Sequence, residues 1–421
     1  MKSLVKRVSA TRYRIKKCRI CHSEDLHEFL SLGTMPIPNG FISKNELSRQ
    51  EFYFPLKACV CKKCWLVQLT HVIPADIMFK NYLYIPSTSS TVVSHFNNFA
   101  DAVVIDFNLK SDDLVVDIGS NDGTLLSAFQ KKGIKVLGVD PAENIVKVAN
   151  KAGIPTKCAF FNELEAEMLR REYGEAKVIS GTNVIAHIDN LHDLVLGVKQ
   201  LLSDDGVFIM EAPYLSDLIE RNEFDTIYHE HLSYFSVRPL VKLFEMYGLK
   251  IIDIQKQKIH GGSIRVFATK KESTLNVHPR VQKFVIEEQA KGLCETQTYD
   301  EFTVRVKRLK SDLLKFLKSL RKEDKSVAAY GAAAKGNVLL NYYKLGTEEI
   351  DFIVDSISYK QGKFTPGTHI PIFPESQLLK KMPDYTLILA WNFAEEIIEK
   401  NKKYQDAGGR FIIPVPYLKV I

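Results

Sequence analysis

The hydrophobic residues of this chain follow a repeating pattern from Leu114 onward, in which short apolar runs alternate with amphipathic segments. The runs LVVDIG (114–119), KVLGVD (135–140) and VFIMEAPYL (207–215) are short and apolar, which predicts buried strands. The segment after the first run has the pattern of a turn and a helix, and Gly133 ends that helix. Because such an alternation is typical of a doubly wound parallel sheet, the sequence predicts an α/β core.

A second alternation of the same kind occupies the C-terminal part of the chain. Residues 276–325 are charged and have helical spacing, which predicts an amphipathic connector. Residues 326–346 then predict a strand, a small-residue turn and a helix, and residues 385–416 predict a strand, a helix and a closing strand. We therefore expect a second, smaller α/β domain.

The length of 421 residues exceeds one ordinary hydrophobic core, so two or three domains are expected. We place an N-terminal domain at 1–85, a central domain at 86–275, and the connector with the C-terminal domain at 276–421. Hydrophobic residues make up 45% and charged residues 25%, as in globular proteins, and no apolar run approaches the roughly 20 residues that cross a bilayer. No membrane partner is expected.

The charge and the N-terminal sequence narrow the class of protein further. The basic N-terminus lacks an apolar core and a small-residue cleavage site, so a cytoplasmic location is the default expectation. The formal charge of +7 is modest and spread over helical faces, which argues against nucleic-acid binding but suits an anionic substrate such as a nucleotide diphosphate.

Cysteine spacing predicts a metal site in the N-terminal domain. Cys18 and Cys21 form one C-x-x-C pair, and Cys61 and Cys64 form another after a long insert. Two such pairs can complete the tetrahedral sulfur shell that zinc prefers, and four sulfur ligands leave no open position, so the zinc is expected to be structural. Cys59 is a spare that could replace Cys61, and a hydrophobic cluster of reduced cysteines is the alternative.

A ligand-binding turn is predicted where the first strand of the central domain ends. VVDIGSNDGTLL places Asp117, Gly119, Asn121 and Gly123 there, with glycines that let backbone approach a ligand. An acid replaces the first glycine of the dinucleotide fingerprint G-x-G-x-x-G, and the pattern resembles motif I of class I methyltransferases that use S-adenosylmethionine. A nicotinamide-dinucleotide domain is the alternative.

Three further residues follow later strands of the same predicted sheet. Asp140 ends the second strand, where an acid accepts hydrogen bonds from ribose hydroxyls. Asn183 and His187, in GTNVIAHI, follow another strand and are expected near the methionine end of the cofactor.

The stretch YHEHLSYFS, residues 228–236, follows the strand VFIMEAPYL and lies close to the ligand-binding edge of the sheet. In an extended conformation Tyr228 and Glu230 would face one way and His229 and His231 the other, whereas in a turn or at a helix start this sorting fails. A metal site, a buried hydrogen-bonded cluster and acid/base chemistry are all compatible with these side chains, and proton transfer is favoured because histidine and tyrosine move protons near neutral pH.

A family resemblance rests on several blocks in the same order. EFDTIYHEHLSYFS, CKKCWLVQL, MPIPNGFI, YGAAAKGNVLLNYY and AWNFAEEIIEK resemble the sugar C-methyltransferases, a family that includes the C-3′-methyltransferase of tetronitrose biosynthesis. The resemblance covers roughly residues 17–416. It implies a class I S-adenosylmethionine methyltransferase core, Rossmann-like, between a zinc-binding N-terminal domain and a smaller Rossmann-like C-terminal domain that helps to hold a nucleotide sugar.

The resemblance also implies an activity and residue roles. The substrate would be a nucleotide-linked 4-keto-6-deoxy sugar or a close relative, deprotonated at C3 and methylated on that carbon. His231 matches the family's base, Tyr228 and Glu230 its partners, and His187 and Tyr84 two further active-site residues. The C-terminal domain offers three candidates for substrate binding. Lys335 and Asn337 lie beside a turn able to approach a diphosphate, and Lys360 lies in a second matching block.

Two other functions fit parts of the sequence. An O- or N-methyltransferase of a sugar or small metabolite would share the cofactor half of the site. A zinc-ribbon nucleic-acid-binding protein with a degenerate methyltransferase fold is suggested by the cysteine pairs, but an aromatic-rich basic stripe is missing. We expect a monomer or a weak homo-oligomer.

Overall fold

Three β-sheets organise the chain in the computed structural model, which describes residues 5–7, 13–74, 78, 87 and 89–421. The N-terminal sheet has the strand order β1-β3-β4-β10, and β2 also pairs with β3. Its strands are β1 (Val5–Arg7), β2 (Leu26–Met35), β3 (Glu51–Cys61), β4 (Val67–Leu69) and β10 (Ser233–Tyr234). Because β10 lies within residues 228–236, called the YHEH stretch below, that stretch is joined to the N-terminal sheet.

The central sheet has seven strands in the order β11-β12-β9-β8-β5-β6-β7. The strands are β5 (Leu114–Ile118), β6 (Lys135–Asp140), β7 (Thr156–Cys158), β8 (Ala176–Thr182), β9 (Leu202–Pro213), β11 (Leu249–Gln257) and β12 (Ser263–Lys270). The first five along the chain run parallel, whereas β12 is antiparallel to β9 and to β11. The predicted α/β core is confirmed, and its parallel strands direct their carboxyl ends to one edge.

Helices cover both faces of the central sheet. They are α2 (Ser90–Asp106), α3 (Thr124–Gln130), α4 (Glu143–Lys151), α5 (Glu163–Tyr173), α6 (Leu191–Leu201), α8 (Val237–Met246) and α9 (Arg280–Ala290). The short helix α7 (Leu215–Glu220) follows β9 and packs into a different core. Residues of α2, α3 and α4 share one apolar core with the sheet, and residues of α5, α6, α8 and α9 share another. Asparagine caps begin α5 and α6, where Asn162 and Asn190 accept backbone N–H bonds from the first turn.

The C-terminal sheet has the order β15-β14-β13-β16-β17-β18. Its strands are β13 (Val327–Tyr330), β14 (Ile353–Asp355), β15 (Ile372–Pro374), β16 (Tyr385–Ile388), β17 (Arg410–Ile413) and β18 (Lys419–Val420), all parallel except β18. Its helices are α11 (Ala334–Tyr343), α12 (Ser376–Lys381), α13 (Ala394–Lys400) and α14 (Lys402–Asp406). The winding direction reverses between β13 and β16, which is where open α/β sheets bind ligands.

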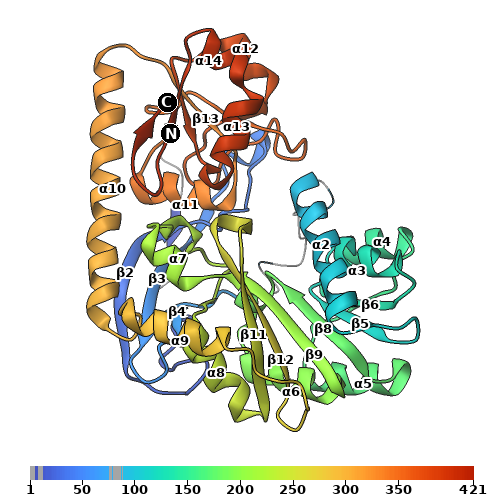
Figure 1. The fold of residues 1–421 in the computed structure, drawn as a ribbon. Helices are drawn as coiled ribbons and strands as arrows, with labels where there is room; N and C mark the ends of the chain where they lie inside the picture. The colour runs from blue at the N-terminus through green and yellow to red at the C-terminus, as the bar shows by residue number, and fades with distance from the viewer. Residues whose placement is uncertain (1–4, 8–12, 75–77, 79–86, 88) are drawn as a thin grey trace.

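The long helix α10 (Thr296–Lys322) links the N-terminal and C-terminal sheets. Figure 1 shows it running alongside both β2 and the C-terminal domain. Apolar residues at helical spacing, including Tyr299, Phe302 and Val306, form one face of the helix and enter a single core with both sheets and with α7. The Thr303 hydroxyl also donates to the carbonyl of Phe29 at 2.7 Å. The predicted connector is thus a packed element of the core.

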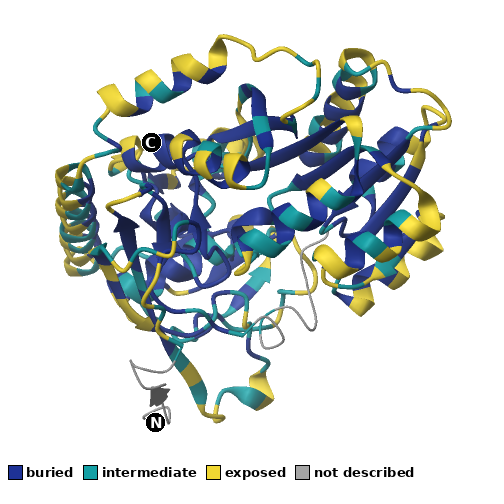
Figure 2. Ribbon diagram, turned by 90° about the horizontal axis from the view of Figure 1, so that it is seen from below, coloured by how far each residue is buried: buried dark blue, intermediate teal, exposed yellow. Residues whose placement is uncertain are grey.

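The buried residues lie mainly in the three sheets. Figure 2 shows buried residues concentrated in the strands and exposed residues on the outer faces of the helices. Among the residues that the structure describes, every helix is too short or too polar to cross a bilayer.

The packing of α10 predicts an asymmetric effect of two substitutions. Phe302→Ala removes a fully buried ring that contacts Phe29, and we expect it to lower the free energy of unfolding by about 3–5 kcal/mol. Val304→Ala, at a residue that is 65% exposed on the same helix, should change it by less than about 0.5 kcal/mol. Urea denaturation measures both, and equal losses would contradict the shared core.

Candidate functional site

The four cysteines of the two C-x-x-C pairs converge on one point. Their Sγ atoms all lie within 4.8 Å of one another, with 3.3 Å between Cys18 and Cys64 and 3.5 Å between Cys21 and Cys61. The arrangement fits the tetrahedral four-sulfur shell of zinc and leaves no ligand position for substrate. Cys59 lies outside this group, so the spare thiol does not replace Cys61, and burial raises the pKa of the Cys59 thiol to about 12.

Arg19, between the first two cysteines, connects the metal centre to the YHEH stretch. Its side chain is almost completely buried, and Nε donates to Asp189 Oδ1 at 2.9 Å. Its Nη1 donates to the carbonyls of Leu69 and Leu232, at 3.3 and 3.2 Å. Leu232 directly follows His231, so the first cysteine pair helps to hold the backbone beside that histidine. The C-x-x-C spacing alone did not indicate this role.

The turn after β5 forms a tight backbone cradle. Gly119 and Gly123 have φ of +67° and +78°, a conformation that glycine adopts without strain. A Cβ on Gly119 would lie 2.5 Å from the Val184 side chain, so no other residue fits there. Asp117 accepts a 2.6 Å bond from the Ser180 hydroxyl, and its burial raises its pKa to about 7.

Asp140 ends β6 beside this cradle, as the spacing predicts. Its Oδ2 accepts from the Asn121 N–H at 3.0 Å and its Oδ1 from the Ala142 N–H at 2.8 Å. Burial raises the pKa of the carboxyl, whereas these two backbone donors lower it. The bonds fix the carboxylate at the carboxyl edge of the sheet, where a ribose could share its oxygens.

Asn183 follows β8 and faces the same cradle. It holds a φ of +57°, and its N–H donates to the carbonyl of Glu211 at 2.7 Å. Its buried side-chain oxygen Oδ1 has no hydrogen-bond partner among the described residues. Because a buried polar atom without a partner is costly, this oxygen is suited to accept a hydrogen bond from a ligand. The residues of this edge therefore fit S-adenosylmethionine.

Glu211, near the end of β9, was not identified from the sequence. It is completely buried, accepts from His95 Nε2 at 2.7 Å and forms an ion pair with Arg265 at 3.0 Å. Burial alone would raise its pKa, but the bond from His95 and the charge of Arg265 lower it below the usual range. The group fastens α2 to β9 and β12. An acid within an apolar strand is the signal that could have indicated it.

Residues 228–231 form a turn, the second of the two conformations that the sequence left open. The N–H of His231 donates to the carbonyl of Tyr228 at 3.0 Å, so the two side chains lie on the same side. Tyr228 Oη and His231 Nε2 share a hydrogen bond of 2.8 Å. The His187 ring meets His231 edge-on with 4.9 Å between centroids, and burial lowers the pKa of His187 to about 4, which keeps it neutral at pH 7.

The other two members of the stretch have different surroundings. His229 is buried and its Nε2 donates to the carbonyl of Phe54 at 3.3 Å, so it holds the turn to β3. Glu230 is 3% exposed, and its Oε1 accepts from Asn39 Nδ2 at 2.6 Å. Burial raises the pKa of Glu230 to about 7, and the bond from Asn39 lowers it.

The C-terminal candidates do not share one environment. The Lys335 ammonium lies 5.0 Å from the centre of the Trp391 ring. Both residues follow the neighbouring parallel strands β13 and β16, between which the winding direction reverses. Asn337 donates to the carbonyl of Pro38 at 2.6 Å, and its buried Oδ1 has no partner among the described residues. Lys360 instead pairs with Asp355 at 3.2 Å, so part of its charge is already compensated.

Two acids near Lys335 were missed by the sequence reasoning. Glu223 and Asp225 are buried, and each has an oxygen without a hydrogen-bond partner among the described residues. Trp391 donates to the other oxygen of Asp225 at 2.7 Å. Burial raises the pKa of Glu223 to about 8, and the charge of Lys335 lowers it. The run RNEFDT is polar, but its position between two sheets depends on the tertiary fold.

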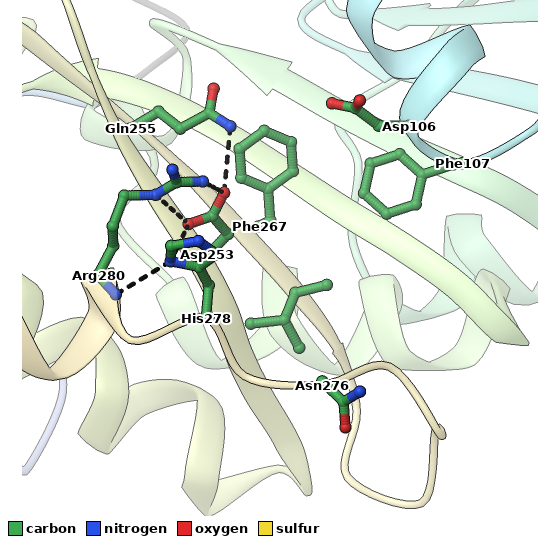
Figure 3. Close-up of a pocket in the computed structure, with 9 residues that line it drawn as sticks. Asp106, Phe107, Asp253, Gln255, Phe267, Asn276, His278 and Arg280 are labelled. Carbon is green, nitrogen blue, oxygen red and sulfur yellow. Dashed lines mark hydrogen bonds and ion pairs between the residues drawn. The ribbon is translucent and has the colours of Figure 1, made fainter.

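A separate pocket of about 310 Å³ lies beside β11 and β12. Figure 3 shows Arg280 and Gln255 directed at Asp253, with Asp106 and Asn276 standing apart: Arg280 pairs with Asp253 at 2.6 Å, and Gln255 donates to the same carboxylate. The Asp253 carboxylate thus has its partners within the pocket. Tyr84, the remaining predicted catalytic residue, lies outside the described residues.

Three family models match successive parts of the chain. Residues 18–79 match a family described as "Putative zinc binding domain", residues 95–254 match "Methyltransferase domain", and residues 258–416 match "C-methyltransferase C-terminal domain". The C-methyltransferase NovU of Streptomyces niveus is 40% identical over 407 residues, which is 97% of this chain and 97% of NovU.

Solved structures also resemble part of the chain. An S-adenosylmethionine-dependent methyltransferase from Clostridium acetobutylicum is 15% identical, with a TM-score of 0.35 over 42% of this chain and 92% of that chain. Magnesium protoporphyrin IX methyltransferase from Synechocystis, with bound S-adenosylhomocysteine, is 16% identical, with a TM-score of 0.34 over 42% of this chain and 83% of that chain.

The metal centre predicts which cysteines retain zinc. Cys64→Ser should reduce the content from about one zinc per chain and lower the melting temperature, because a ligand of the four-sulfur shell is lost. Cys59→Ser and the exposed Cys158→Ser should keep the full content. Elemental analysis of purified protein checks this, and stoichiometric zinc in Cys64→Ser would refute the assignment.

The cofactor edge predicts a loss of affinity. Asp140→Asn removes the charge that accepts two hydrogen bonds and would accept those of a ribose. A lost bond to a charged group is worth roughly 1.5–3 kcal/mol, so S-adenosylmethionine should bind on the order of 10- to 100-fold more weakly. Calorimetry measures the affinity, with Asp106→Asn, an exposed residue at the end of α2, as the control. Unchanged affinity in Asp140→Asn would contradict the placement.

Proposed function

Because this chain belongs to the family of S-adenosylmethionine-dependent C-methyltransferases, we propose that it methylates a carbon atom of a nucleotide-diphosphate-linked 4-keto sugar. The enzyme uses S-adenosylmethionine and carries a structural zinc ion. More specifically, we propose that the acceptor is a 4-keto-6-deoxy sugar or a close relative, and that its C3 atom receives the methyl group.

The cofactor residues would lie at the carboxyl edge of the central sheet. We propose that six residues contact the cofactor. Asp117, Gly119, Asn121 and Gly123 lie at the end of β5 and in the turn after it, and Asp140 and Asn183 lie at the ends of the neighbouring strands β6 and β8. When bound, S-adenosylmethionine supplies an electrophilic methyl group attached to positively charged sulfur. The remaining chemistry, removal of a proton from the sugar and stabilisation of the resulting charge, falls to side chains of the protein.

The single observation that carries the proposal is that the histidine pair lies in and against the loop that packs on the proposed cofactor turn. His231 bonds Tyr228 and packs on His187, four residues after Asn183. Val184 in turn lies against Gly119. A carbon acid bound beside His231 would therefore be close to the cofactor edge.

His231 is the proposed base. A 4-keto group makes the C3 proton acidic, and a neutral imidazole can accept it near pH 7. Tyr228 is within hydrogen-bond distance of Nε2 and can hold the ring in position or donate to the sugar oxygen. Neutral His187 is a further proposed donor to the enolate oxygen, because preorganised donors stabilise charge that develops during the reaction. Glu230 is the further proposed partner of the sugar, as a carboxylate that accepts a hydrogen bond from it. Tyr84 remains a proposed contributor.

The nucleotide would lie between the central and C-terminal sheets. Lys335 begins α11 at the point where the C-terminal sheet reverses its winding, and its charge suits a diphosphate. The Asn337 Oδ1 is a buried acceptor for a ligand donor. Lys360 is a weaker candidate because Asp355 already holds it.

The proposed base is tested by hydrogen exchange at C3. Purified protein in D₂O with a panel of nucleotide 4-keto sugars should catalyse C3 exchange, and His231→Asn should lose exchange and methyl transfer by on the order of 10²- to 10⁴-fold while still binding cofactor. His278→Asn, in the separate pocket, serves as the control. Fast exchange in His231→Asn would assign the base to another residue.

The same assay distinguishes the rival chemistry. An O- or N-methyltransferase has no reason to remove the C3 proton, so it would transfer methyl without catalysing exchange. Exchange in the absence of S-adenosylmethionine is expected for the C-methyltransferase, because proton removal precedes bond formation in the proposed order.

A further inference from the structure

The loop of residues 36–41, sequence PIPNGF, reaches from the N-terminal domain to the proposed catalytic turn. Asn39 Nδ2 donates to Glu230 Oε1 at 2.6 Å, across 191 positions of the chain. Glu230 is 3% exposed, and its other oxygen, Oε2, has no hydrogen bond to any described residue. One oxygen of a buried carboxylate is therefore held by the loop, and the other is left for a ligand.

The loop itself is anchored on its far side by the C-terminal domain. Asn337, on α11, donates to the carbonyl of Pro38 at 2.6 Å. Ile42 and Phe364 exchange both backbone hydrogen bonds, at 3.0 and 2.8 Å. A local bond from the Gly40 N–H to the carbonyl of Ile37 completes the turn. Asn39 is thus presented to Glu230 by a segment that is fixed at both ends.

The geometry points to Asn39 as a positioning residue for the reaction: it orients the Glu230 carboxylate so that Oε2 faces the substrate. This inference rests on the proposed function, because it takes Glu230 as a partner of the ketosugar. A buried carboxylate without donors is costly, and an amide supplied across the domain interface stabilises the ionised form. The N-terminal domain then contributes to the active site as well as to the zinc centre.

The charge surroundings determine the expected pH effect. Among the described residues, the ionisable groups of the turn and of the elements around it include Tyr228, His229 and His231 on the turn itself, His187 and Tyr234 packed against His231, and Lys335 on α11, the helix that holds the loop. The bond from Asn39 lowers the pKa of Glu230, which burial raises. Removing the donor therefore raises that pKa further, so the carboxylate is lost at a higher pH.

The size of the shift follows from the strength of the bond. A hydrogen bond to a charged group contributes roughly 1.5–3 kcal/mol, which corresponds to about one to two pH units. The acid limb of the methyl-transfer rate should move up by that amount in Asn39→Leu. Asn39→Ser, whose hydroxyl is too short to replace the amide, should shift it in the same direction and serves if Asn39→Leu folds poorly.

A second readout does not depend on activity. The Glu230 carboxyl carbon, identified in a ¹³C spectrum by its loss in Glu230→Gln, should titrate about one to two units higher in Asn39→Leu than in the parent protein. Asn401→Leu, which removes a side-chain amide that bonds Ile397 within the C-terminal domain, is the matched control and should leave the titration and the rate profile unchanged.

Two outcomes would overturn the inference. The first is a lower melting temperature in Asn39→Leu with an unchanged Glu230 titration. The second is a shifted titration with an unmoved acid limb in a parent enzyme that methylates a ketosugar. Failure of the parent enzyme to act on any ketosugar, with the titration shifted, would instead refute the proposed function and the catalytic part of this assignment while keeping the contact.

Discussion

The backbone of Leu232 is the point on which the arrangement of the site depends. Its carbonyl accepts from the Leu69 N–H at 2.9 Å and from Arg19, and its N–H donates to the carbonyl of Ala186 at 2.7 Å. The residue before it is His231 and the residue after Ala186 is His187. The backbone of one residue is therefore bonded to the N-terminal sheet, to Arg19 of the metal knuckle and to the loop that follows β8. A shift of any of these three would move the two histidines relative to each other.

This junction explains why a structural metal stands so near a proposed reaction centre. Four sulfur ligands leave zinc no position for substrate, but they fix the backbone around Arg19. Arg19 is a positioning element because its guanidinium donates to backbone carbonyls of both the N-terminal sheet and the YHEH stretch. Arg19 thus connects the zinc-binding domain to the proposed reaction centre through hydrogen bonds to the backbone, and the two sites share no ligand.

Features that depend on neighbouring residues could be predicted from the sequence. The turn that is proposed to bind the cofactor lies within one strand, turn and helix, so the spacing from Asp117 to Gly123 was enough to predict a turn at the end of β5. The cysteine pairs were equally local, because each C-x-x-C directs two thiols at one point. The alternation of apolar runs predicted both α/β sheets for the same reason.

Contacts between distant segments could not be predicted in this way. Asn39 and Glu230 are 191 positions apart, and Glu211 meets His95 across 116 positions, so no spacing rule connects them. The sequence left the conformation of residues 228–231 open between extended and turn, because the turn bond between Tyr228 and His231 forms only in the folded surroundings and determines which side chains meet.

The site combines a cofactor edge, a histidine pair and a buried acid held by another domain, and its central claim is transfer of methyl to carbon. The most direct test uses S-adenosylmethionine labelled with ¹³C in the methyl group, a nucleotide 4-keto sugar as acceptor, and NMR of the product. The account predicts that the labelled methyl couples to a sugar ring carbon. A label attached to oxygen or nitrogen would contradict it.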